Sequence, residues 1–454
     1  MPQSLQIVAA NVDPALLDLP WEVPLEDWPE DILAALPRGI SRHVVRFVNL
    51  AGRVIAVKEI GESVAHHEYE LLRDLARMGA PSVEPTAVVT GRRDAEGNEL
   101  NAVLVTEHLE FALPYRALFS RHVSPETVDR LLDALAVLLV RLHLLGFYWG
   151  DVSLSNTLFR RDADAFSAYL VDAETGDLQP RLTDGQREYD LDIARTNIIG
   201  ELFDLQAGGF LEESADAIEI GDRLVRRYEE LWNELTGAEL IDASERWRVA
   251  QRIHRLADLG FSVGELTMTS EPDGDRMVIQ PKVVDAGHHH RRLMRLTGID
   301  AQELQARRML EDLETYRAVN GLNDLPIEQV AHRWLSDVYE SVIRRVPQEM
   351  SAKLEGPQLF HEILEHRWYL SQQRMRDVPL DEVVDSYLSD VLPEKRDEAV
   401  LLSGPDDEVL AGYADLGDGR DPAARYDPED DLIDGWVGSG DPDEDAGTAL
   451  GPGS

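Results

Sequence analysis

The 454-residue chain contains no cysteine. Disulfide bonds, thiolate metal sites and cysteine nucleophiles are therefore excluded. The start of the chain also lacks a basic segment followed by an apolar one, and no run approaches the roughly 18 apolar residues needed to cross a bilayer. We therefore expect a soluble, cytoplasmic protein without a membrane span.

Positive charge is scarce in this chain. Lys and Arg number 44 against 86 Asp and Glu, which gives a formal net charge of −42. Part of the excess lies in residues 404–454, where 15 Asp or Glu face only two Arg. Because so acidic a protein repels phosphate backbones and anionic lipid headgroups, we expect neither nucleic acid nor membrane among its partners.

Turn residues and hydrophobic periodicity divide the chain into four parts. The first is an irregular lead-in punctuated by proline, and the second is a unit of mixed strands and helices. The third is mainly helical with one β-hairpin, and the last is a disordered acidic tail rich in Gly, Pro and Asp. The predicted bounds of these parts are 1–40, 41–212, 213–402 and 403–454.

The second part shows the clearest local patterns. Two β-branched runs, 43–50 and 53–58, flank Ala51-Gly52 and predict a β-hairpin, and a helix is expected over 61–79. The strongest helix signal has Ser124 as N-cap, Pro125 at the first position and Gly146 just past the end. Its leucines recur on one face, which indicates a buried core helix.

Charged residues at the ends of these elements suit phosphoryl transfer from ATP. This reaction needs a cation for the phosphates, oxygen ligands for magnesium and an acceptor for the substrate proton. Lys58 ends a predicted strand, and Glu68 on the next helix can hold it extended. Asp151 and Asn156 stand five residues apart on one loop, and Asp172 closes a further apolar strand.

Together, Lys58, Glu68, the Asp151–Asn156 loop and Asp172 resemble the catalytic set of the protein-kinase-like superfamily. Within this superfamily, the set is most similar to those of the lipopolysaccharide-kinase, RIO-type and aminoglycoside-phosphotransferase branches. Over residues 40–400 the chain resembles an actinobacterial family of kinase-like proteins that joins such a core to a C-terminal domain of unknown function.

The resemblance implies an α+β fold class, with a bilobal protein-kinase-like fold followed by the mainly helical domain and the tail. It implies ATP and Mg²⁺ as cofactors, Asn156 and Asp172 as metal ligands and Asp151 as the catalytic residue. The hinge would run from Thr106 to Leu109, where the backbone of Glu107 and Leu109 meets adenine. Either Asp190 or Asp192 would brace the catalytic loop.

Two features depart from the kinase pattern. The expected phosphate loop, residues 37–43, has one glycine, so Ser41 and Arg42 are assigned to phosphate binding in place of glycine amides. Asp172 is followed by Ala173-Glu174, which leaves Glu174 able to approach the metal. Because no activation segment of protein-kinase length follows, a small-molecule, glycan or lipid hydroxyl is favoured as acceptor over a protein.

Two hypotheses for the function follow. The first is an ATP- and magnesium-dependent phosphotransferase with a non-protein hydroxyl acceptor. The second is a nucleotide-binding pseudokinase scaffold that engages a protein partner through its C-terminal domain.

Three further patterns have plainer interpretations. The run His288-His289-His290 is interpreted as a helix start or an anion contact. The segment 361–366 resembles a zinc-protease helix only superficially. That motif needs two histidines four residues apart, whereas these two are five residues apart and do not share one helix face. The tryptophans of the third part are expected in its core, namely Trp232, Trp247, Trp334 and Trp368.

Overall fold

The computed structural model describes residues 4–9, 13–34, 43–119, 125–212, 214–242, 245, 247–270, 276–395 and 398. Three predictions from the sequence lie outside the described residues: the acidic tail 403–454, the phosphate-loop residues Ser41 and Arg42, and the N-cap Ser124. None of the described helices is long and apolar enough to cross a membrane.

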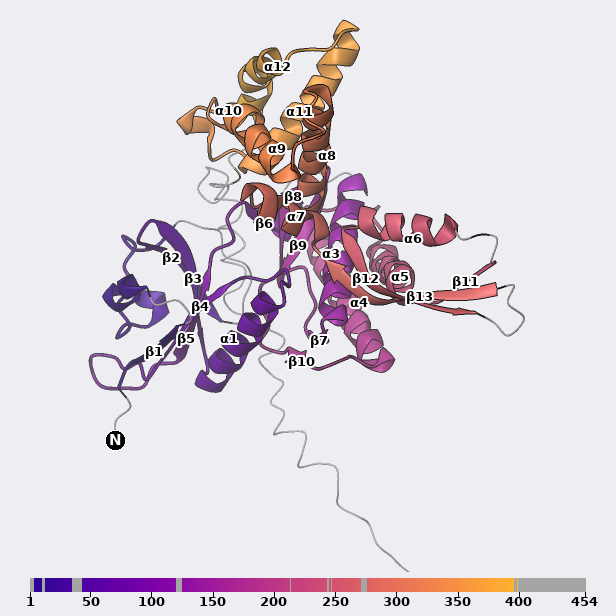
Figure 1. The fold of residues 1–454 in the computed structure, drawn as a ribbon. Coiled ribbons are helices and arrows are strands. Elements are labelled where there is room, and N and C mark those ends of the chain that lie inside the picture. The colour runs from indigo at the N-terminus through magenta and orange to yellow at the C-terminus, as the bar shows by residue number, and fades with distance from the viewer. Residues whose placement is uncertain are drawn as a thin grey trace, which may run out of the picture. The chain divides into compact units, whose positions relative to one another are not determined.

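The small lobe is a five-stranded antiparallel sheet with one helix (Figure 1). The strand order is β1-β4-β5-β3-β2, and α1 packs against β4 and β5. The predicted hairpin and helix are present as β2, β3 and α1. The bounds are β1 Gln6–Ala9, β2 Val44–Leu50, β3 Arg53–Ile60, α1 Glu62–Arg77, β4 Pro85–Thr90 and β5 Ala102–Glu107.

Alternate residues of this sheet enter two different cores, because successive strand side chains point to opposite faces. On β5, Leu104 joins the core that holds α1, whereas Val103 and Val105 face the other side. That second face is covered by the chain before β2, including Trp21 and Trp28. The segment expected to be an irregular lead-in thus supplies an edge strand, β1, and a buried cover built on η1 (Pro14–Asp18) and η2 (Leu25–Asp27).

Arg92 fastens this cover to the sheet. Its guanidinium, fully buried, donates to the carbonyl oxygens of Trp21 (3.0 Å) and Val23 (2.6 Å) and to Glu59 Oε1 (2.7 Å). The other carboxylate oxygen of Glu59 accepts the amide of Leu25 at 3.2 Å. One ion pair therefore satisfies backbone groups of the cover that would otherwise be buried without partners.

The large lobe is built around the predicted buried helix, α3. Helix α5 and strand β9 pack against α3, and α4 packs against α5. Two small sheets, β6-β8-β9 and β7-β10, flank the loops between these elements. The bounds are β6 Ala112–Pro114, α2 Tyr115–Phe119, α3 Pro125–Leu144, β7 Phe147–Tyr148, β8 Thr157–Asp162, β9 Ala165–Leu170, β10 Asp177–Leu178, α4 Asp184–Ala207 and α5 Ala217–Thr236.

Gly146 ends α3 as predicted and has a specific steric role. Its φ is +84°, and a Cβ at this position would meet the carbonyl oxygen of Gln179 at 1.9 Å. Any other residue would push β7 away from the segment that follows β10.

The core of the large lobe continues beyond residue 212. Leu224 and Tyr228 of α5 are buried in the same cluster as the leucines of α3. The division at 212/213 stays a prediction. After α5, β11 and the expected hairpin form a three-stranded sheet in the order β11-β13-β12, with α6 packed on β12. The bounds are β11 Glu239–Asp242, α6 Trp247–Asp258, β12 Phe261–Ser270 and β13 Arg276–Ala286.

The remaining chain forms helices around a separate core (Figure 1). Trp334 is fully buried in this core, but Trp247 and Trp368 are 61% and 65% exposed, so the expectation that they fill a core is wrong. The bounds are α7 His288–Thr297, α8 Glu303–Val319, α9 Ile327–Trp334, η4 Leu335–Tyr339, α10 Glu340–Ile343, η5 Gln348–Met350, α11 Gly356–Arg374, α12 Leu380–Ser386, η6 Tyr387–Val391 and η7 Leu392–Glu394.

Replacing Arg92 should destabilise the small lobe strongly. The substitution Arg92→Met keeps most of the volume but leaves the Glu59 carboxylate without its cation and removes the guanidinium donor from the carbonyl oxygens of Trp21, Val23 and Asn101. Breaking a buried pair in this way costs about 3–5 kcal/mol. Urea denaturation followed by tryptophan fluorescence would measure this loss.

The neighbouring residue offers a matched control. Arg93 pairs with Glu99, whose side chain is 77% exposed, so Arg93→Met should change the free energy of unfolding by no more than about 1 kcal/mol. Equal effects of the two substitutions would contradict the role given to Arg92.

Candidate functional site

Lys58 lies at the centre of a cluster of carboxylates. Its Nζ is 3.1 Å from Glu68 Oε2 on α1, 2.8 Å from Asp172 Oδ2 and 3.0 Å from Glu174 Oε2. Lys58 stands on β3, and the two other acids follow β9, so one ammonium connects three elements. The predicted Lys58–Glu68 pair is thus present, and the structure adds Glu174 to it.

The electrostatics of this cluster are unbalanced. Burial alone would lower the pKa of Lys58, but the nearby carboxylates of Glu68, Asp172 and Glu174 outweigh it and raise that pKa. For Glu68, burial first and repulsion from Asp172 second raise the pKa to about 7, against the attraction of Lys58. Three acids share one cation, so the cluster can accept further positive charge.

The loop after β7 carries Asp151 and Asn156. Asn156 Nδ2 donates to Asp151 Oδ2 at 3.1 Å and to its carbonyl oxygen at 3.0 Å, which turns Asn156 Oδ1 away from that carboxylate. Asn197 of α4 holds the other side, donating to Asp151 Oδ1 at 3.3 Å and to the carbonyl oxygen of Val152 at 3.1 Å. The Asp151 carboxylate is therefore fixed by an amide on each oxygen.

Asp190, and not Asp192, braces this loop. Its two carboxylate oxygens, fully buried, accept the amides of Trp149 (2.9 Å) and Gly150 (2.8 Å). His143 Nε2 lies 3.1 Å from the same carboxylate, and Tyr228 of α5 lies 2.7 Å from His143 Nδ1. Gly150 has a φ of +79°, which suits glycine at this tight turn. Of the two residues predicted to brace the catalytic loop, the structure therefore selects Asp190.

Two residues of α4 escaped the sequence analysis. They are Asn197, described above, and Glu201. The carboxylate of Glu201 accepts the backbone amides of Leu154 (2.7 Å) and Ser155 (2.8 Å). Asp190, Asn197 and Glu201 are seven and four residues apart, so they lie on one helical face that borders the catalytic loop. This polar stripe is the one signal that the sequence gives for them, but a solvated helix face produces the same pattern.

The candidate site lies in one cleft with a volume of about 600 Å³. Of the predicted site residues, all that the structure describes line it: Lys58, Glu68, Glu107, Leu109, Asp151, Asn156 and Asp172. Val45, Ala56, Leu104 and Leu158 add an apolar part. Ser41 and Arg42, the two other predicted site residues, lie outside the described residues. His43, at the end of the expected phosphate loop, lies 3.1 Å from Glu174 Oε2.

The hinge backbone is partly engaged in sheet bonding. The Glu107 amide donates to the carbonyl oxygen of Glu84 at 2.8 Å, and the His108 amide donates to that of Val54 at 3.1 Å. Within the described part of the chain no hydrogen bond uses the amide of Leu109. A planar ligand in the cleft could therefore bond this amide.

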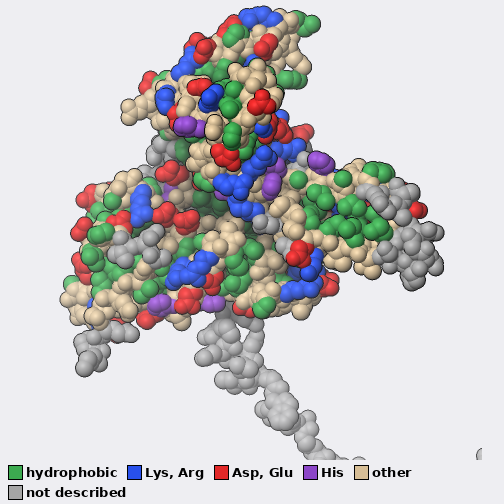
Figure 2. Space-filling model, in the orientation of Figure 1, with side chains coloured by type: hydrophobic (Ala, Val, Ile, Leu, Met, Phe, Trp, Pro, Cys, Tyr) green, Lys and Arg blue, Asp and Glu red, His purple; other side chains and the backbone are tan. Residues whose placement is uncertain are grey.

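The histidine run begins a helix, as interpreted from the sequence. Helix α7 starts at His288, and Glu303 accepts the amides of His289 (2.8 Å) and His290 (3.0 Å). Figure 2 shows Lys, Arg and His side chains gathered over α7 on this face of the molecule. Glu303 already caps the helix, so these histidines are accounted for by the fold.

Comparison with known proteins assigns two family models to the chain. Residues 50–197 match the lipopolysaccharide kinase (Kdo/WaaP) family, and residues 230–392 match DUF4032, a domain of unknown function. These matches confirm the resemblance stated from the sequence, and they confirm a kinase-type phosphotransferase core. No curated protein matches the chain.

Solved structures give weaker similarities. One is WaaP in complex with acyl carrier protein, at 17% identity and a TM-score of 0.34, covering 56% of this chain and 99% of that one. Another is the BubR1 kinase domain, at 13% identity and a TM-score of 0.26, covering 33% and 48%.

The carboxylate cluster predicts a pH-dependent effect of Glu68→Gln. Because the pKa of Glu68 rises from 4.5 to about 7 on folding, the folded protein keeps a proton that the unfolded chain releases within that window. Wild type therefore loses stability at this residue as pH rises from about 4.5 to 7, and Glu68→Gln does not. Urea denaturation across this range should show the variant gaining on wild type by on the order of 1–3 kcal/mol.

Glu70, exposed on the same helix, provides the control. Glu70→Gln should give a difference from wild type that stays flat with pH. A flat or falling difference for Glu68→Gln would contradict the charge balance described for the cluster.

Proposed function

Since the chain carries a lipopolysaccharide kinase (Kdo/WaaP) family domain followed by a DUF4032 domain, we propose that it transfers the γ-phosphate of ATP, with Mg²⁺, to a non-protein hydroxyl acceptor. The observation that carries this proposal is the convergence of Lys58, Asp172, Asp151 and Asn156 on one cleft. These residues come from β3, the loop after β9 and the loop after β7, and phosphoryl transfer needs this combination of groups.

The donor set fits a magnesium ion. Asp172 and Glu174 supply carboxylate oxygens and Asn156 supplies an amide oxygen, which are the hard ligands that Mg²⁺ prefers. The surplus of acid around Lys58 favours an additional cation. A bound Mg²⁺ would neutralise charge that develops on the transferring phosphoryl group.

Lys58 is positioned as the phosphate ligand. Glu68 is 99% buried and holds the ammonium from α1, while Asp172 is the first acid after β9. An ammonium fixed at this point can bind the α- and β-phosphates as a compact charge. Adenine would then lie toward the hinge, against Ala56 and Leu104, with the Leu109 amide as a donor.

Asp151 is assigned to the acceptor hydroxyl. Two amide groups, from Asn156 and Asn197, orient its carboxylate without neutralising it. A carboxylate held in this way can accept the substrate proton or align the hydroxyl for attack. Thr196, Gly200 and Asp204 of α4 line the same cleft as Asn197, and they are candidates for contacts with the acceptor.

The proposed acceptor class is supported by the short segment between Asp172 and α4. Only the two-residue strand β10 and its connections occupy this interval, since α4 begins at Asp184. A protein substrate is usually presented by a longer segment at this place. The short connection supports a small-molecule, glycan or lipid hydroxyl.

Replacing Asp151 should separate chemistry from binding. Asp151→Asn removes the proton acceptor but keeps the size of the side chain and an acceptor oxygen for one of the two amides. ATP turnover with Mg²⁺ should therefore fall by at least about a hundredfold. The affinity for a fluorescent ATP analogue should change little. Radiolabelled γ-phosphate release to water provides a basal assay that needs no known acceptor.

Asp192→Asn is the matched control, because Asp192 is exposed on α4 and is not assigned to the site. It should leave turnover unchanged. If wild type binds ATP but shows no turnover, the pseudokinase scaffold replaces this proposal. If Asp151→Asn turns over ATP as fast as wild type, Asp151 does not have the assigned role.

A further inference from the structure

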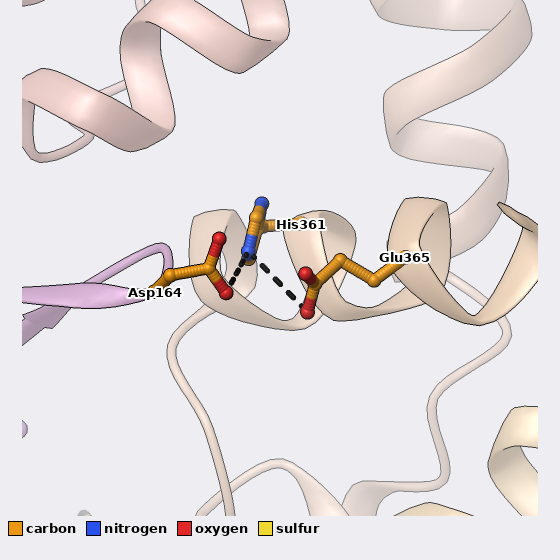
Figure 3. Close-up of side chains that lie close together, drawn as sticks. All are labelled: Asp164, His361 and Glu365. Atoms are coloured by element: carbon orange, nitrogen blue, oxygen red, sulfur yellow. Dashed lines mark ion pairs between the residues drawn. The ribbon is translucent and has the colours of Figure 1, made fainter. Parts of the chain in front are cut away.

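A histidine and two carboxylates meet far from Lys58 in the sequence. Asp164 lies in the turn between β8 and β9, whereas His361 and Glu365 belong to α11 (Figure 3). Four residues apart on a helix, His361 and Glu365 share one face. His361 Nε2 is 3.7 Å from Asp164 Oδ1 and 3.6 Å from Glu365 Oε2, and the three ligand atoms lie within 4.8 Å of one another.

The imidazole of His361 is buried without a hydrogen-bond partner at Nε2. Its side chain is only 2% exposed, yet both carboxylates lie beyond hydrogen-bond distance of that nitrogen. A charged hydrogen bond would draw a carboxylate to about 2.7–2.9 Å. Figure 3 shows this nitrogen directed at both carboxylates. An unsatisfied buried nitrogen costs free energy, so a ligand between the three groups would relieve it.

The directions of the pKa shifts of His361 and Glu365 agree with a neutral imidazole beside two carboxyl groups. Burial is the main cause that lowers the pKa of His361. Burial first and then Asp164 raise the pKa of Glu365, because the two carboxylates repel each other. Arg308 is near, but its Nη2 is 4.0 Å from Asp164 Oδ2, the oxygen that does not face His361.

The turn that carries Asp164 is held in place on the helices. The Ala163 amide donates to Gln358 Oε1 at 3.1 Å, and Gln358 Nε2 donates back to the Ala163 carbonyl oxygen at 3.2 Å. The amide of Gln305 on α8 donates to Asp162 Oδ1 at 2.9 Å. Asp164 is therefore presented to α11 by a fixed backbone, so little ordering is needed for a third ligand.

We propose that Asp164, His361 and Glu365 form a binding site for a first-row divalent metal ion, best matched by Zn²⁺. Imidazole nitrogen with carboxylate oxygens is a Zn²⁺ donor set, whereas Mg²⁺ and Ca²⁺ prefer oxygen alone. Bond lengths of about 2.0–2.1 Å in a tetrahedron require ligand atoms about 3.4 Å apart. The distances from His361 Nε2 exceed this by only a few tenths of an ångström.

A metal ion at this site would link the two regions of the chain that match the two family models. Asp164 lies within the Kdo/WaaP match, and His361 and Glu365 lie within the DUF4032 match. Asp164 and Glu365 are 57% and 49% exposed, so an ion can enter from solvent, and a fourth coordination position remains for water. Metal binding would stabilise the contact between the β8–β9 turn and α11.

A metal titration of the full-length protein tests this site. Metal-free protein is titrated with Zn²⁺ against a chromophoric chelator in excess Mg²⁺, which occupies oxygen-only sites. Wild type should bind one Zn²⁺ and unfold at a higher temperature when it is present. Asp164→Asn and Glu365→Gln, both at exposed positions, should weaken binding by at least about a hundredfold, since even supporting groups of a metal site contribute 10–100-fold.

His366→Asn is the matched control. His366 is on the same helix, but its Nε2 lies 3.0 Å from Ser386 Oγ, so this variant should bind Zn²⁺ like wild type. Co²⁺ in wild type should give visible absorption bands typical of four-coordination, and Glu365→Gln should lose them. The proposal is overturned if wild type fails to bind Zn²⁺, or if Asp164→Asn and Glu365→Gln bind it as tightly as wild type.

Discussion

The ammonium of Lys58 is the point at which the small-lobe sheet, α1 and the loop after β9 meet. Without a cation there, Glu68, Asp172 and Glu174 would be three partly or fully buried carboxylates in mutual repulsion. The attraction of the three carboxylates for the Lys58 ammonium outweighs the effect of burial on its pKa, so the cation stays charged among them. The geometry proposed for phosphate and metal binding depends on this one residue.

The catalytic loop depends on a second set of contacts, all anchored in the large lobe. Asp190 fixes the amides at the start of the loop, Glu201 fixes those of Leu154 and Ser155, and Asn197 orients Asp151. Tyr228 of α5 reaches this network through His143. Because α5 also packs against α3, the helix that follows the kinase-like elements contributes directly to the order of the loop.

Much of this arrangement could be predicted from local sequence, and the rest could not for physical reasons. Asp151, Asn156 and Asp172 lie in loops beside patterned elements, so their spacing indicated their convergence with Lys58. Lys58 itself was expected to end its strand, but β3 continues to Ile60 because Glu59 and Ile60 still pair with β5. Asn197 and Glu201 lie inside a long helix, where polarity alone does not tell a loop contact from a solvated face. The site of Asp164 and His361 joins residues almost 200 positions apart, and the segment 361–366 was judged by its two histidines when the relevant pair was His361 and Glu365. The cover over the sheet was missed because proline-rich sequence without periodicity gives no sign of burial.

The central claim is that these separate elements form a single nucleotide cleft. The most direct measurement is a crystal structure with a non-hydrolysable ATP analogue and Mg²⁺. It should show the metal bound by Asn156 and Asp172, Lys58 Nζ in contact with a phosphate oxygen, and adenine beside Leu109. A nucleotide bound elsewhere, or one in this cleft with its phosphates out of reach of Lys58, would contradict the account.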